Sequence, residues 1–460
     1  MMNSKNIQNL FWFRRDLRLA DNHALAKALA NGSTLCCFIW DRAIIDKLEK
    51  DNLRVAFIEQ SLNELKTKLQ NAGSDLIICL GNPQEELTNL INQYGISKLY
   101  FNEDYEPWAI SRDKKIIESL KSDCHTSSFT YKDQVVFHKN EILNKENRPY
   151  HVYSAYKKAW LSRLVESDYI NHPSNELLNN LAKIFPQQSF YQPSQDGFNA
   201  KLTLLAGEDA ANDRLNKFLK NIDEYHLTRN FPDVDSTSYL GVDLRFGTIS
   251  IRQLVRLALT RQSEGAETWL SELIWRDFFS QILYNYPYVV NSAFNRKYTN
   301  LAYENNQEMF QKWCDGQTGY PIVDAAMRQL NQTGFMHNRL RMIVASFLCK
   351  DLLIDWRWGE QYFSKRLLDY DLASNNGNWQ WCASTGCDAQ PYFRIFNPLL
   401  QSKKFDESGN FIRKYVPELS SLDNKQIHEP IIDIFSEINY PMPIVIHKEQ
   451  AQKAIAMFKG

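Results

Sequence analysis

Residues 53–80 read LRVAFIEQSLNELKTKLQNAGSDLIICL, and this stretch decides the fold of the first part of the chain. Five apolar residues in it recur every three or four positions: Val55, Ile58, Leu62, Leu65 and Leu69. This period predicts a helix over 53–70 with one apolar face. Gly73 ends the helix, and the apolar run Leu76–Leu80 then predicts a buried strand.

The same alternation extends to both sides of this stretch. Four further runs predict strands, over Leu10–Phe13, Leu35–Trp40, Lys98–Phe101 and Ser127–Tyr131. Strands that alternate with helices form βαβ units, so residues 1–132 are predicted to be a doubly wound α/β domain with a parallel sheet. The glycine-rich motifs of dinucleotide and triphosphate sites are absent. Arg14 and Arg15 after the first strand could hold an anion or form structural ion pairs, and we favour ion pairs.

The rest of the chain has a different character. Residues 133–207 contain four spaced prolines and no clear period, which predicts an irregular interdomain connector. Residues 208–460 are predicted to form a mostly α-helical domain. Its expected helices are Asp209–Lys220, Ile251–Thr260, Thr268–Leu283, Pro321–Gln332, His337–Asp351 and Trp358–Leu368.

Composition limits the possible functions. The 460 residues carry 53 basic and 54 acidic side chains, so a polybasic protein is excluded and any nucleic-acid site must be a local patch. The eight cysteines are scattered without zinc-site spacing, so we expect no metal site and a reducing, cytoplasmic location. No apolar run reaches the ~18 residues of a membrane span, and no signal peptide is evident.

A first polar cluster lies in the stretch WLSELIWRDFF at 269–279. Helical spacing places Glu272, Trp275, Arg276 and Phe279 on one face. One interpretation is a surface Glu–Arg pair above a packed tryptophan. The other is a pocket wall, in which the indole stacks on a planar ligand, the guanidinium holds phosphate and the carboxyl donates a proton.

A second polar cluster is MHNRLRM at 336–342, where Asn338, Arg339 and Met342 share a face and Arg341 points elsewhere. The two arginines need partners, for which Asp369 and Asp371 are candidates, while His337 is interpreted as a local structural histidine. Residues 328–414 contain 12 basic and 8 acidic side chains. Basic residues among aromatic ones suit nucleic-acid binding, but a solvated basic face is an equally good interpretation.

Four motifs together resemble the photolyase/cryptochrome family, specifically the class I cyclobutane pyrimidine dimer DNA photolyases. They are FWFRRDLR at 11–18, WLSELIWR at 269–276, MHNRLRM at 336–342 and DYDLASNNGNWQW at 369–381. The resemblance implies an α/β antenna domain and a helical domain that binds FAD. It also implies light-driven repair, in which excited, reduced, anionic FAD gives an electron to a flipped-out dimer and the dimer splits.

The resemblance also implies roles for individual residues. The FAD ligands would be Tyr225, Thr237, Ser238, Tyr239, Leu240, Gly241, Trp269, Asp369, Asp371 and Asn375. The dimer would be bound by Glu272, Trp275, Asn338, Met342 and Trp381. DNA would be contacted by Arg229, Glu272, Trp275, Arg276, Asn338, Arg339 and Gln401.

The sequence departs from the family pattern at two places. Electrons would reach the flavin through Trp379 and Trp356, but Tyr303 stands where the family has the outermost tryptophan, and Trp313 or Trp358 could substitute for it. The second departure is YEPWA at 105–109, where folate-binding relatives have an Asn-Glu pair. A methenyltetrahydrofolate antenna is therefore in doubt, and a deazaflavin, a second flavin or no antenna are the alternatives.

A cryptochrome-like blue-light signalling protein is the closest alternative function on this fold. Asn375, the intact set of dimer-binding residues and the short stretch after Lys414 favour repair. A photolyase for (6-4) lesions is disfavoured because His337 is followed by Asn338, and a flavoprotein without DNA activity would leave the tryptophan and arginine clusters unexplained. The expected partner is damaged DNA, with no membrane, no obligatory protein partner and a monomeric state.

Overall fold

A computed structural model describes residues 7–187, 189–431 and 438–459. The chain folds into two compact units. The first unit contains the described residues up to Pro149, Lys157–Asp223 and Ser238–Tyr284. The second unit contains Tyr150–Tyr156, Glu224–Thr237 and the described residues from Asn285 onward.

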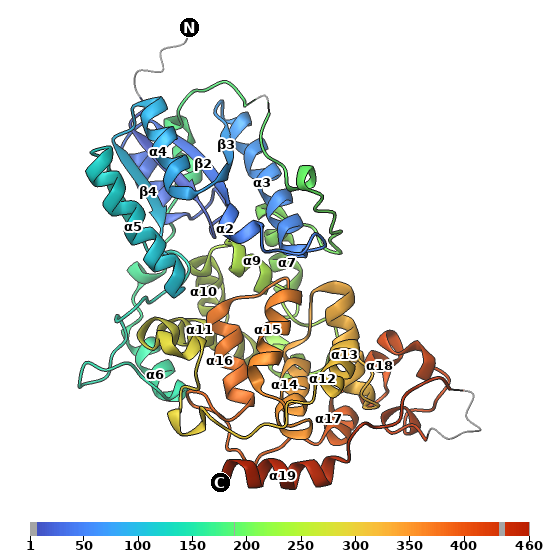
Figure 1. Cartoon of the computed structure of the whole chain (residues 1–460). Coiled ribbons are helices and arrows are strands. Elements are labelled where there is room, and N and C mark those ends of the chain that lie inside the picture. Colours follow the sequence, from blue (N-terminus) through green and yellow to red (C-terminus); the bar gives the residue numbers. More distant parts are fainter. Residues whose placement is uncertain (1–6, 188, 432–437, 460) are drawn as a thin grey trace. The chain divides into compact units, whose positions relative to one another are not determined.

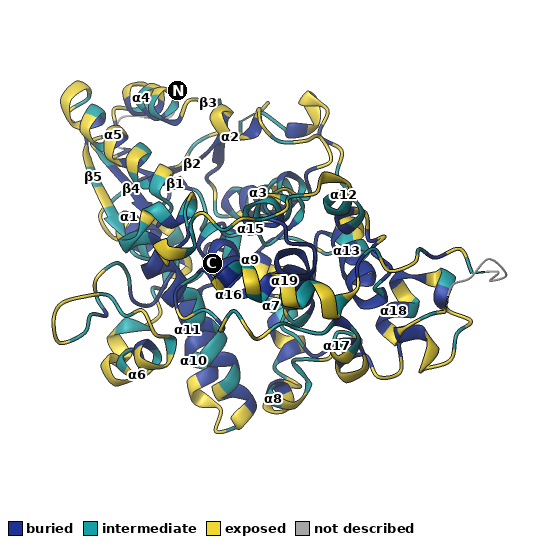
Figure 2. Ribbon diagram, turned by 60° about the horizontal axis from the view of Figure 1, so that its bottom comes forward, coloured by how far each residue is buried: buried dark blue, intermediate teal, exposed yellow. Residues whose placement is uncertain are grey.

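The first unit is built on a five-stranded parallel sheet. Its strands are β1 (Asn9–Phe13), β2 (Thr34–Asp41), β3 (Leu76–Gly81), β4 (Lys98–Asn102) and β5 (Ser127–Tyr131), in the spatial order β3-β2-β1-β4-β5. Strands β1 and β2 are buried along their whole length (Figure 2). From β1 the chain adds β2 and β3 on one side and then β4 and β5 on the other, which is the strand order of a doubly wound sheet. The predicted doubly wound α/β fold is therefore confirmed.

Helices cover this sheet (Figure 1). They are α1 (His23–Ala30), the short α2 (Arg42–Ile45), α3 (Leu53–Asn71), α4 (Pro83–Tyr94) and α5 (Pro107–Asp123). Leucines and isoleucines of α4 and α5 form one core cluster with Leu10, Trp12 and Leu35 of the strands. The helix predicted over 53–70 is confirmed, and Asn52 caps its start by accepting from the backbone N–H of Arg54.

The arginines after β1 form structural ion pairs, as favoured from the sequence. Arg14 lies 2.6 Å from Asp113 and its guanidinium covers the ring of Trp12. Arg15 lies 3.2 Å from Asp104 and also contacts Glu106. These partners neutralise both guanidinium groups inside the first unit, so the structure gives no reason to assign them to an anion.

The stretch 133–207 is less irregular than predicted. It contains the α-helix α6 (Tyr153–Arg163). The sequence did not indicate this helix because its apolar residues do not recur on one face. It is followed by α7 (Glu208–Phe218), α9 (Gly241–Phe246), α10 (Ile251–Thr260) and α11 (Glu264–Asn285).

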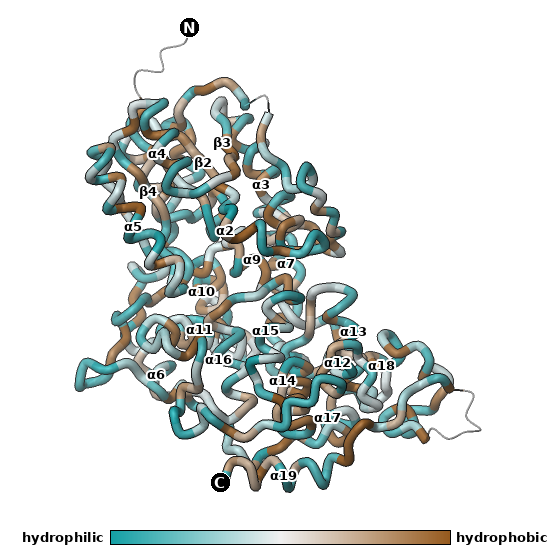
Figure 3. The backbone as a smooth tube through the Cα atoms, viewed as in Figure 1, coloured by the Kyte–Doolittle hydropathy of each residue, from teal (hydrophilic) through white to brown (hydrophobic). Residues whose placement is uncertain are grey.

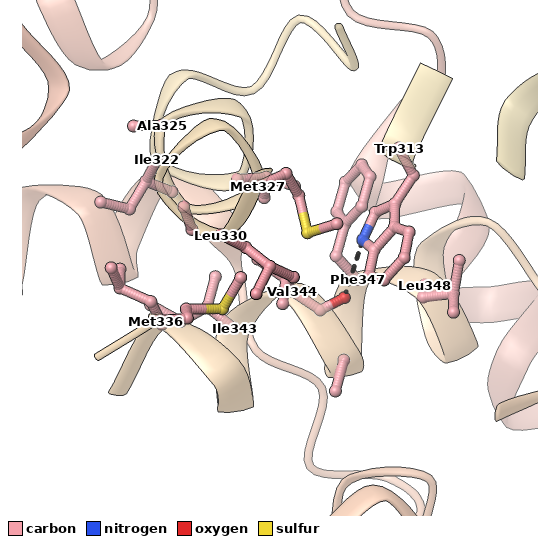
Figure 4. Close-up of a cluster of buried hydrophobic side chains, with 14 of the residues drawn as sticks. Trp313, Ile322, Ala325, Met327, Leu330, Met336, Ile343, Val344, Phe347 and Leu348 are labelled. Atoms are coloured by element: carbon pink, nitrogen blue, oxygen red, sulfur yellow. Dashed lines mark hydrogen bonds between the residues drawn. The ribbon is translucent and has the colours of Figure 1, made fainter. Parts of the chain in front are cut away.

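The second unit is helical around one large core. Its helices are α8 (Tyr225–Thr228), α12 (Gln307–Asp315), α13 (Pro321–Thr333), α14 (Asn338–Ser346), α15 (Trp356–Arg366), α16 (Leu372–Cys382), α17 (Pro398–Phe405), α18 (Asn410–Tyr415) and α19 (His447–Lys459). Trp313, Met327, Leu330 and Phe347 lie in this core (Figure 4). Helix α19 is mainly hydrophilic (Figure 3), with Ala454 and Phe458 buried.

Two helix boundaries of this unit differ from the prediction. The helix expected over 337–351 is α-helical only as α14 and continues as a π-helix over Phe347–Asp351. Helix α15 begins two residues earlier than expected because Asp355 caps it, accepting from the backbone N–H of Arg357. In the part of the chain that the structure describes, no helix combines the length and apolar character needed to cross a membrane.

Candidate functional site

A cavity of about 80 Å³ opens in the second unit. Helices α14, α15 and α16 supply most of its wall. Its lining includes six residues to which the resemblance assigns a role: Asn338, Met342, Asp369, Asp371, Asn375 and Trp379. Arg341 also lines it, although helical spacing had been expected to point Arg341 away from Asn338 and Met342. The fold therefore brings together motifs that lie up to 41 positions apart in the sequence.

An ion pair forms part of the cavity wall. Both carboxylate oxygens of Asp369 accept from Nη2 of Arg341, at 2.9 and 3.1 Å. Arg341 Nε also donates to the carbonyl of Met336 at 2.8 Å, which holds the guanidinium in place. Asp369 is thus the partner predicted for one of the two arginines. Asp371 has another role, because it caps α16 by accepting from the backbone N–H of Ser374 at 3.0 Å.

The amide of Asn375 is oriented by a neighbour that the sequence analysis missed. Its Nδ2 donates to Oε1 of Glu360 at 3.1 Å and to the carbonyl of Glu360 at 3.3 Å. With the amide nitrogen engaged in this way, the carbonyl oxygen of Asn375 is the side-chain acceptor left for a ligand. Burial raises the pKa of the Glu360 carboxyl. Glu360 lies 15 positions before Asn375 on a different helix, and no local pattern links the two.

A second group of polar atoms suits a diphosphate. The hydroxyls of Ser236 and Thr237 are buried without a hydrogen-bond partner among the described residues, which is rare for a native polar group. Tyr225 on α8 is buried, and the guanidinium of Arg229 lies 5.4 Å from the centre of its ring. Unpaired hydroxyl donors in the same unit as the cavity are what a phosphate-bearing cofactor requires, so these residues fit FAD.

The first unit holds the remaining residues that the resemblance assigns to FAD. Ser238 accepts from the backbone N–H of Leu240 at 3.4 Å, and Tyr239 has a left-handed backbone with φ of 54°. Gly241 begins α9. Trp269 is buried against Phe218, with ring centres 4.9 Å apart.

Helix α11 confirms the shared face predicted for 272–279. The rings of Trp275 and Phe279 stack with centres 5.3 Å apart, and Glu272, Trp275 and Arg276 are all half-buried. Arg276 donates to the carbonyls of Gln134 and Leu244, the latter at 3.3 Å. These bonds orient its guanidinium, and the residue stays half-buried.

Arg339 is a cation without a carboxylate partner among the described residues. Its Nη2 donates to Oδ1 of Asn230 at 2.7 Å, and its guanidinium lies 4.5 Å from the centre of the Phe405 ring. Burial and the nearby charge of Arg229 lower its pKa. Because a neutral amide holds Arg339, its positive charge is available to an anion.

Helix α17 lies next to Arg339, because its last residue is Phe405, whose ring faces the Arg339 guanidinium. Phe405 ends it, Gln401 is half-buried on it, and Leu400, Lys403 and Lys404 are exposed. Asn338 is exposed at the start of α14, and Trp381 is half-buried near the end of α16. Exposed cations beside the exposed Leu400 fit both interpretations of this basic stretch, a nucleic-acid surface and a solvated basic face.

His337 has the local structural role that the sequence indicated. Its Nδ1 accepts from the backbone N–H of Arg339 at 3.1 Å and so caps α14. Burial and the charges of Arg341, Arg339 and Arg229 lower its pKa to about 4. The capping bond requires an unprotonated Nδ1, so the neutral ring is the form that the fold uses.

The free energy of unfolding should depend on pH through this cap, because protonation of His337 removes the capping hydrogen bond. Because the folded-state pKa of His337 lies below the ordinary value of 6.5, the unfolded chain binds more protons between the two values. The contribution of the neutral His337 ring to the free energy of unfolding is complete above pH 6.5. It is lost as the pH falls towards 4, and the total loss is about 3 kcal/mol. We expect His337→Asn, which keeps a capping acceptor but does not titrate, to flatten the dependence in urea unfolding followed by tryptophan fluorescence. An equally steep fall in stability in this variant would contradict the assignment.

Family comparisons agree with the motifs. A model described as the FAD binding domain of DNA photolyase matches residues 269–460, and one described as DNA photolyase matches residues 9–176. The chain is 41% identical to the deoxyribodipyrimidine photo-lyase of Salmonella typhimurium, with 98% of each chain covered. It is 39% identical to that of Vibrio cholerae, covering 98% of this chain and 99% of the relative.

Solved structures show the same similarity. A bacterial class III photolyase from Agrobacterium tumefaciens superposes with a TM-score of 0.90 at 33% identity, covering 99% of this chain and 98% of the other. An archaeal photolyase from Sulfolobus tokodaii, solved with two FAD molecules, gives 0.84 at 33% identity, covering 98% of this chain and 100% of the other. A cryptochrome from Synechocystis gives 0.87 at 28% identity, with the same coverage.

Proposed function

The chain belongs to the DNA photolyase family, and on that premise we propose which of its residues bind FAD, the damaged bases and the DNA backbone. The protein is an FAD-binding enzyme of light-dependent DNA repair that splits cyclobutane pyrimidine dimers. One observation carries the residue assignment. The cavity of the second unit combines an Arg341–Asp369 pair with the oriented amide of Asn375, which are hydrogen-bonding groups for a planar heterocycle.

We assign FAD to the residues whose polar atoms need a ligand. Ser236, Thr237 and Ser238 supply hydroxyls for the diphosphate, and Tyr225 and Trp269 supply ring surfaces. The backbone of Tyr239 and Leu240 continues the same loop up to Gly241, the first residue of α9. Asp369, Asp371 and Asn375 bind the polar edge of the flavin. When bound and reduced, FAD absorbs light and supplies the electron that splits the dimer.

The damaged bases are assigned to a second set of side chains. Trp275 and Trp381 provide rings on which flipped-out bases stack, and Met342 provides a polarizable contact. Glu272 donates a proton or a hydrogen bond to a dimer carbonyl, and Asn338 bonds the same bases through its amide. Arg229, Arg276, Arg339 and Gln401 contact the phosphate backbone, where Arg339 brings a charge without a carboxylate partner in the described chain.

The function is tested by counting dimers. The FAD-loaded, chemically reduced protein is mixed with an oligonucleotide that contains one thymine dimer, and intact dimers are measured after blue light and after equal time in darkness. We expect loss of dimers only in light. Loaded protein that leaves every dimer intact in light would contradict the repair function, and light-dependent binding of a signalling partner would become the alternative.

We propose that any second chromophore is a flavin or a deazaflavin rather than methenyltetrahydrofolate. In the first unit Glu106 is already bound by Arg15 and Arg245, at 3.1 and 3.0 Å, and Pro107 and Trp108 stand where a folate-binding pair would be. The Sulfolobus tokodaii relative, with its two FAD molecules, supports a flavin. Mass spectrometry of the cofactors released from purified protein distinguishes the three compounds.

We further propose that the enzyme works as a monomer in the cytoplasm. All eight cysteines are free thiols, which suits a reducing compartment. Damaged DNA is its partner, and the residues assigned above all come from one chain. Light scattering of the loaded protein would detect a dimer if one formed.

A further inference from the structure

Residues 133–137 form a buried stretch of backbone that is neither helix nor strand. Val135, Val136 and Phe137 in this segment are each no more than 2% exposed. A buried backbone N–H or carbonyl group needs a hydrogen-bond partner, and a segment outside helices and strands does not obtain one from regular pairing. The partners of this segment therefore come from side chains of other elements.

Two consecutive residues of α11 supply such partners. Oδ2 of Asp277 accepts from the backbone N–H of Val136 at 3.1 Å and from that of Phe137 at 3.2 Å. Nη1 of Arg276 donates to the carbonyl of Gln134. A carboxylate and a guanidinium thus hold donors and an acceptor of the same short segment, and the segment links the two side chains.

The Asp277 carboxylate is itself held in place. The residue is 1% exposed, and Nε1 of Trp160 on α6 donates to the same Oδ2 at 3.1 Å. Trp160 also packs edge-on against Phe137, with ring centres 5.4 Å apart. Oδ1 is buried without a partner among the described residues, and burial raises the pKa of the carboxyl to about 6. An apolar side chain would avoid the cost of burying this oxygen, but it would leave two backbone N–H groups without their acceptor.

The other end of the segment is fixed as well. Asp133 forms ion pairs with Arg18 at 2.8 Å and with Arg252 at 2.7 Å. The side-chain amide of Gln134 donates to the carbonyl of Glu103 at 3.1 Å. The segment is therefore anchored on both sides of the Gln134 carbonyl.

This anchoring makes the Gln134 carbonyl a fixed acceptor for Arg276. The guanidinium donates to it and, at 3.3 Å, to the carbonyl of Leu244. Two acceptors in fixed positions limit the rotation of a planar guanidinium, whose bonds to phosphate depend on its orientation. Arg276 is half-buried, so part of its side chain reaches solvent.

We propose that Asp277 is a positioning residue for DNA binding, which fixes the 133–137 segment and, through it, the guanidinium of Arg276. The inference rests on the proposed contact of Arg276 with the DNA backbone. Asp277 is buried and does not touch DNA itself. Its contribution to DNA affinity therefore depends on the presence of Arg276.

A double-mutant cycle tests this dependence. Arg276→Met, Asp277→Asn and the double variant are loaded with FAD, and fluorescence anisotropy measures their affinity for an oligonucleotide with one thymine dimer. We expect Arg276→Met to weaken binding about tenfold or more, and Asp277→Asn about three- to tenfold. In the Arg276→Met background, Asp277→Asn should change the affinity by less than about twofold. With saturating DNA, the repair yield per absorbed photon should be the same in Asp277→Asn as in the unsubstituted protein, because the carboxylate takes no part in splitting the dimer.

Asp324→Asn is the matched control. Asp324 on α13 is also a buried carboxylate that accepts from two successive backbone N–H groups, those of Thr318 at 2.7 Å and Gly319 at 3.1 Å. It holds a different segment, in the second unit. We expect the control to keep its DNA affinity even if its unfolding temperature falls. An equal loss of affinity in the control would show a general effect on folding and overturn the positioning role.

Two further results would overturn the proposal. One is an Asp277→Asn protein with unchanged affinity, or with a loss that is as large without Arg276 as with it. The other is unchanged affinity in Arg276→Met, which would also remove Arg276 from the DNA surface, whereas the repair function is decided separately by counting dimers after blue light. If Asp277→Asn does not fold, Trp160→Phe takes its place in the cycle, because it removes one donor to the carboxylate, and the same dependence on Arg276 is expected.

Discussion

Replacing Asp369 by asparagine is expected to reduce the FAD content of the purified protein about tenfold or more. Both oxygens of this carboxylate accept from Nη2 of Arg341 in the cavity wall. Asparagine removes the negative charge and turns an amide N–H₂ group towards the guanidinium. Because a hydrogen bond to a charged group contributes about 1.5–3 kcal/mol, the guanidinium would move and the wall would lose its shape.

The measurement is the ratio of flavin to protein after release of the cofactor. Glu418→Gln is the matched control, because Glu418 pairs with Arg328 at 2.7 Å with similar exposure in the same unit and does not line the cavity. We expect this control to keep its FAD, and Asp369→Glu to recover part of the loss. Full FAD content in Asp369→Asn would contradict the role of Asp369, and equal losses in the control would show that the effect is on folding.

Replacing Arg339 by methionine is expected to weaken binding of dimer-containing DNA by about ten- to a hundredfold. Methionine keeps much of the apolar contact with Phe405 but removes the charge. It also leaves Asn230 Oδ1 without the donor that lies 2.7 Å away. If Arg339 contacts a phosphate, the slope of log affinity against log salt concentration should fall by about one.

Fluorescence anisotropy at several salt concentrations measures both quantities. Lys312→Met is the control, because Lys312 is a half-buried cation on α12 that pairs with Glu308 on the same helix at 2.8 Å. We expect the control to keep both affinity and slope. An Arg339→Met protein with unchanged affinity and slope would remove Arg339 from the DNA surface.

The sequence by itself determined the features that depend on local repetition. The apolar period of 53–70 and the apolar run of 76–80 were enough to predict α3 and β3, and the alternation of such segments predicted the parallel sheet. Helical spacing placed Trp275 and Phe279 on one face, where the rings stack. These features depend on residues only a few positions apart, so they can be predicted from the sequence alone.

The sequence also predicted a contact where only a few side chains could be the partner. Two arginines beside an apolar helix needed carboxylates, and Asp369 proved to be the partner of Arg341. The types of the side chains could not show that Asp371 and Arg339 do not pair with each other. Asp371 caps α16 instead, and Arg339 is held by the neutral Asn230. Each of these choices depends on which side chains the packed helices bring within about 3 Å.

Only the tertiary structure decided the arrangements that join distant elements. Glu360 reaches Asn375 from a different helix, and the ring series Trp379, Trp313, Phe310 and Trp358 draws on α12, α15 and α16. Even α6 and the π-helical turn at 347–351 are absent from the local pattern. The reason is physical: periodicity records which face of a helix is apolar, whereas the pairing of side chains depends on how those faces pack together.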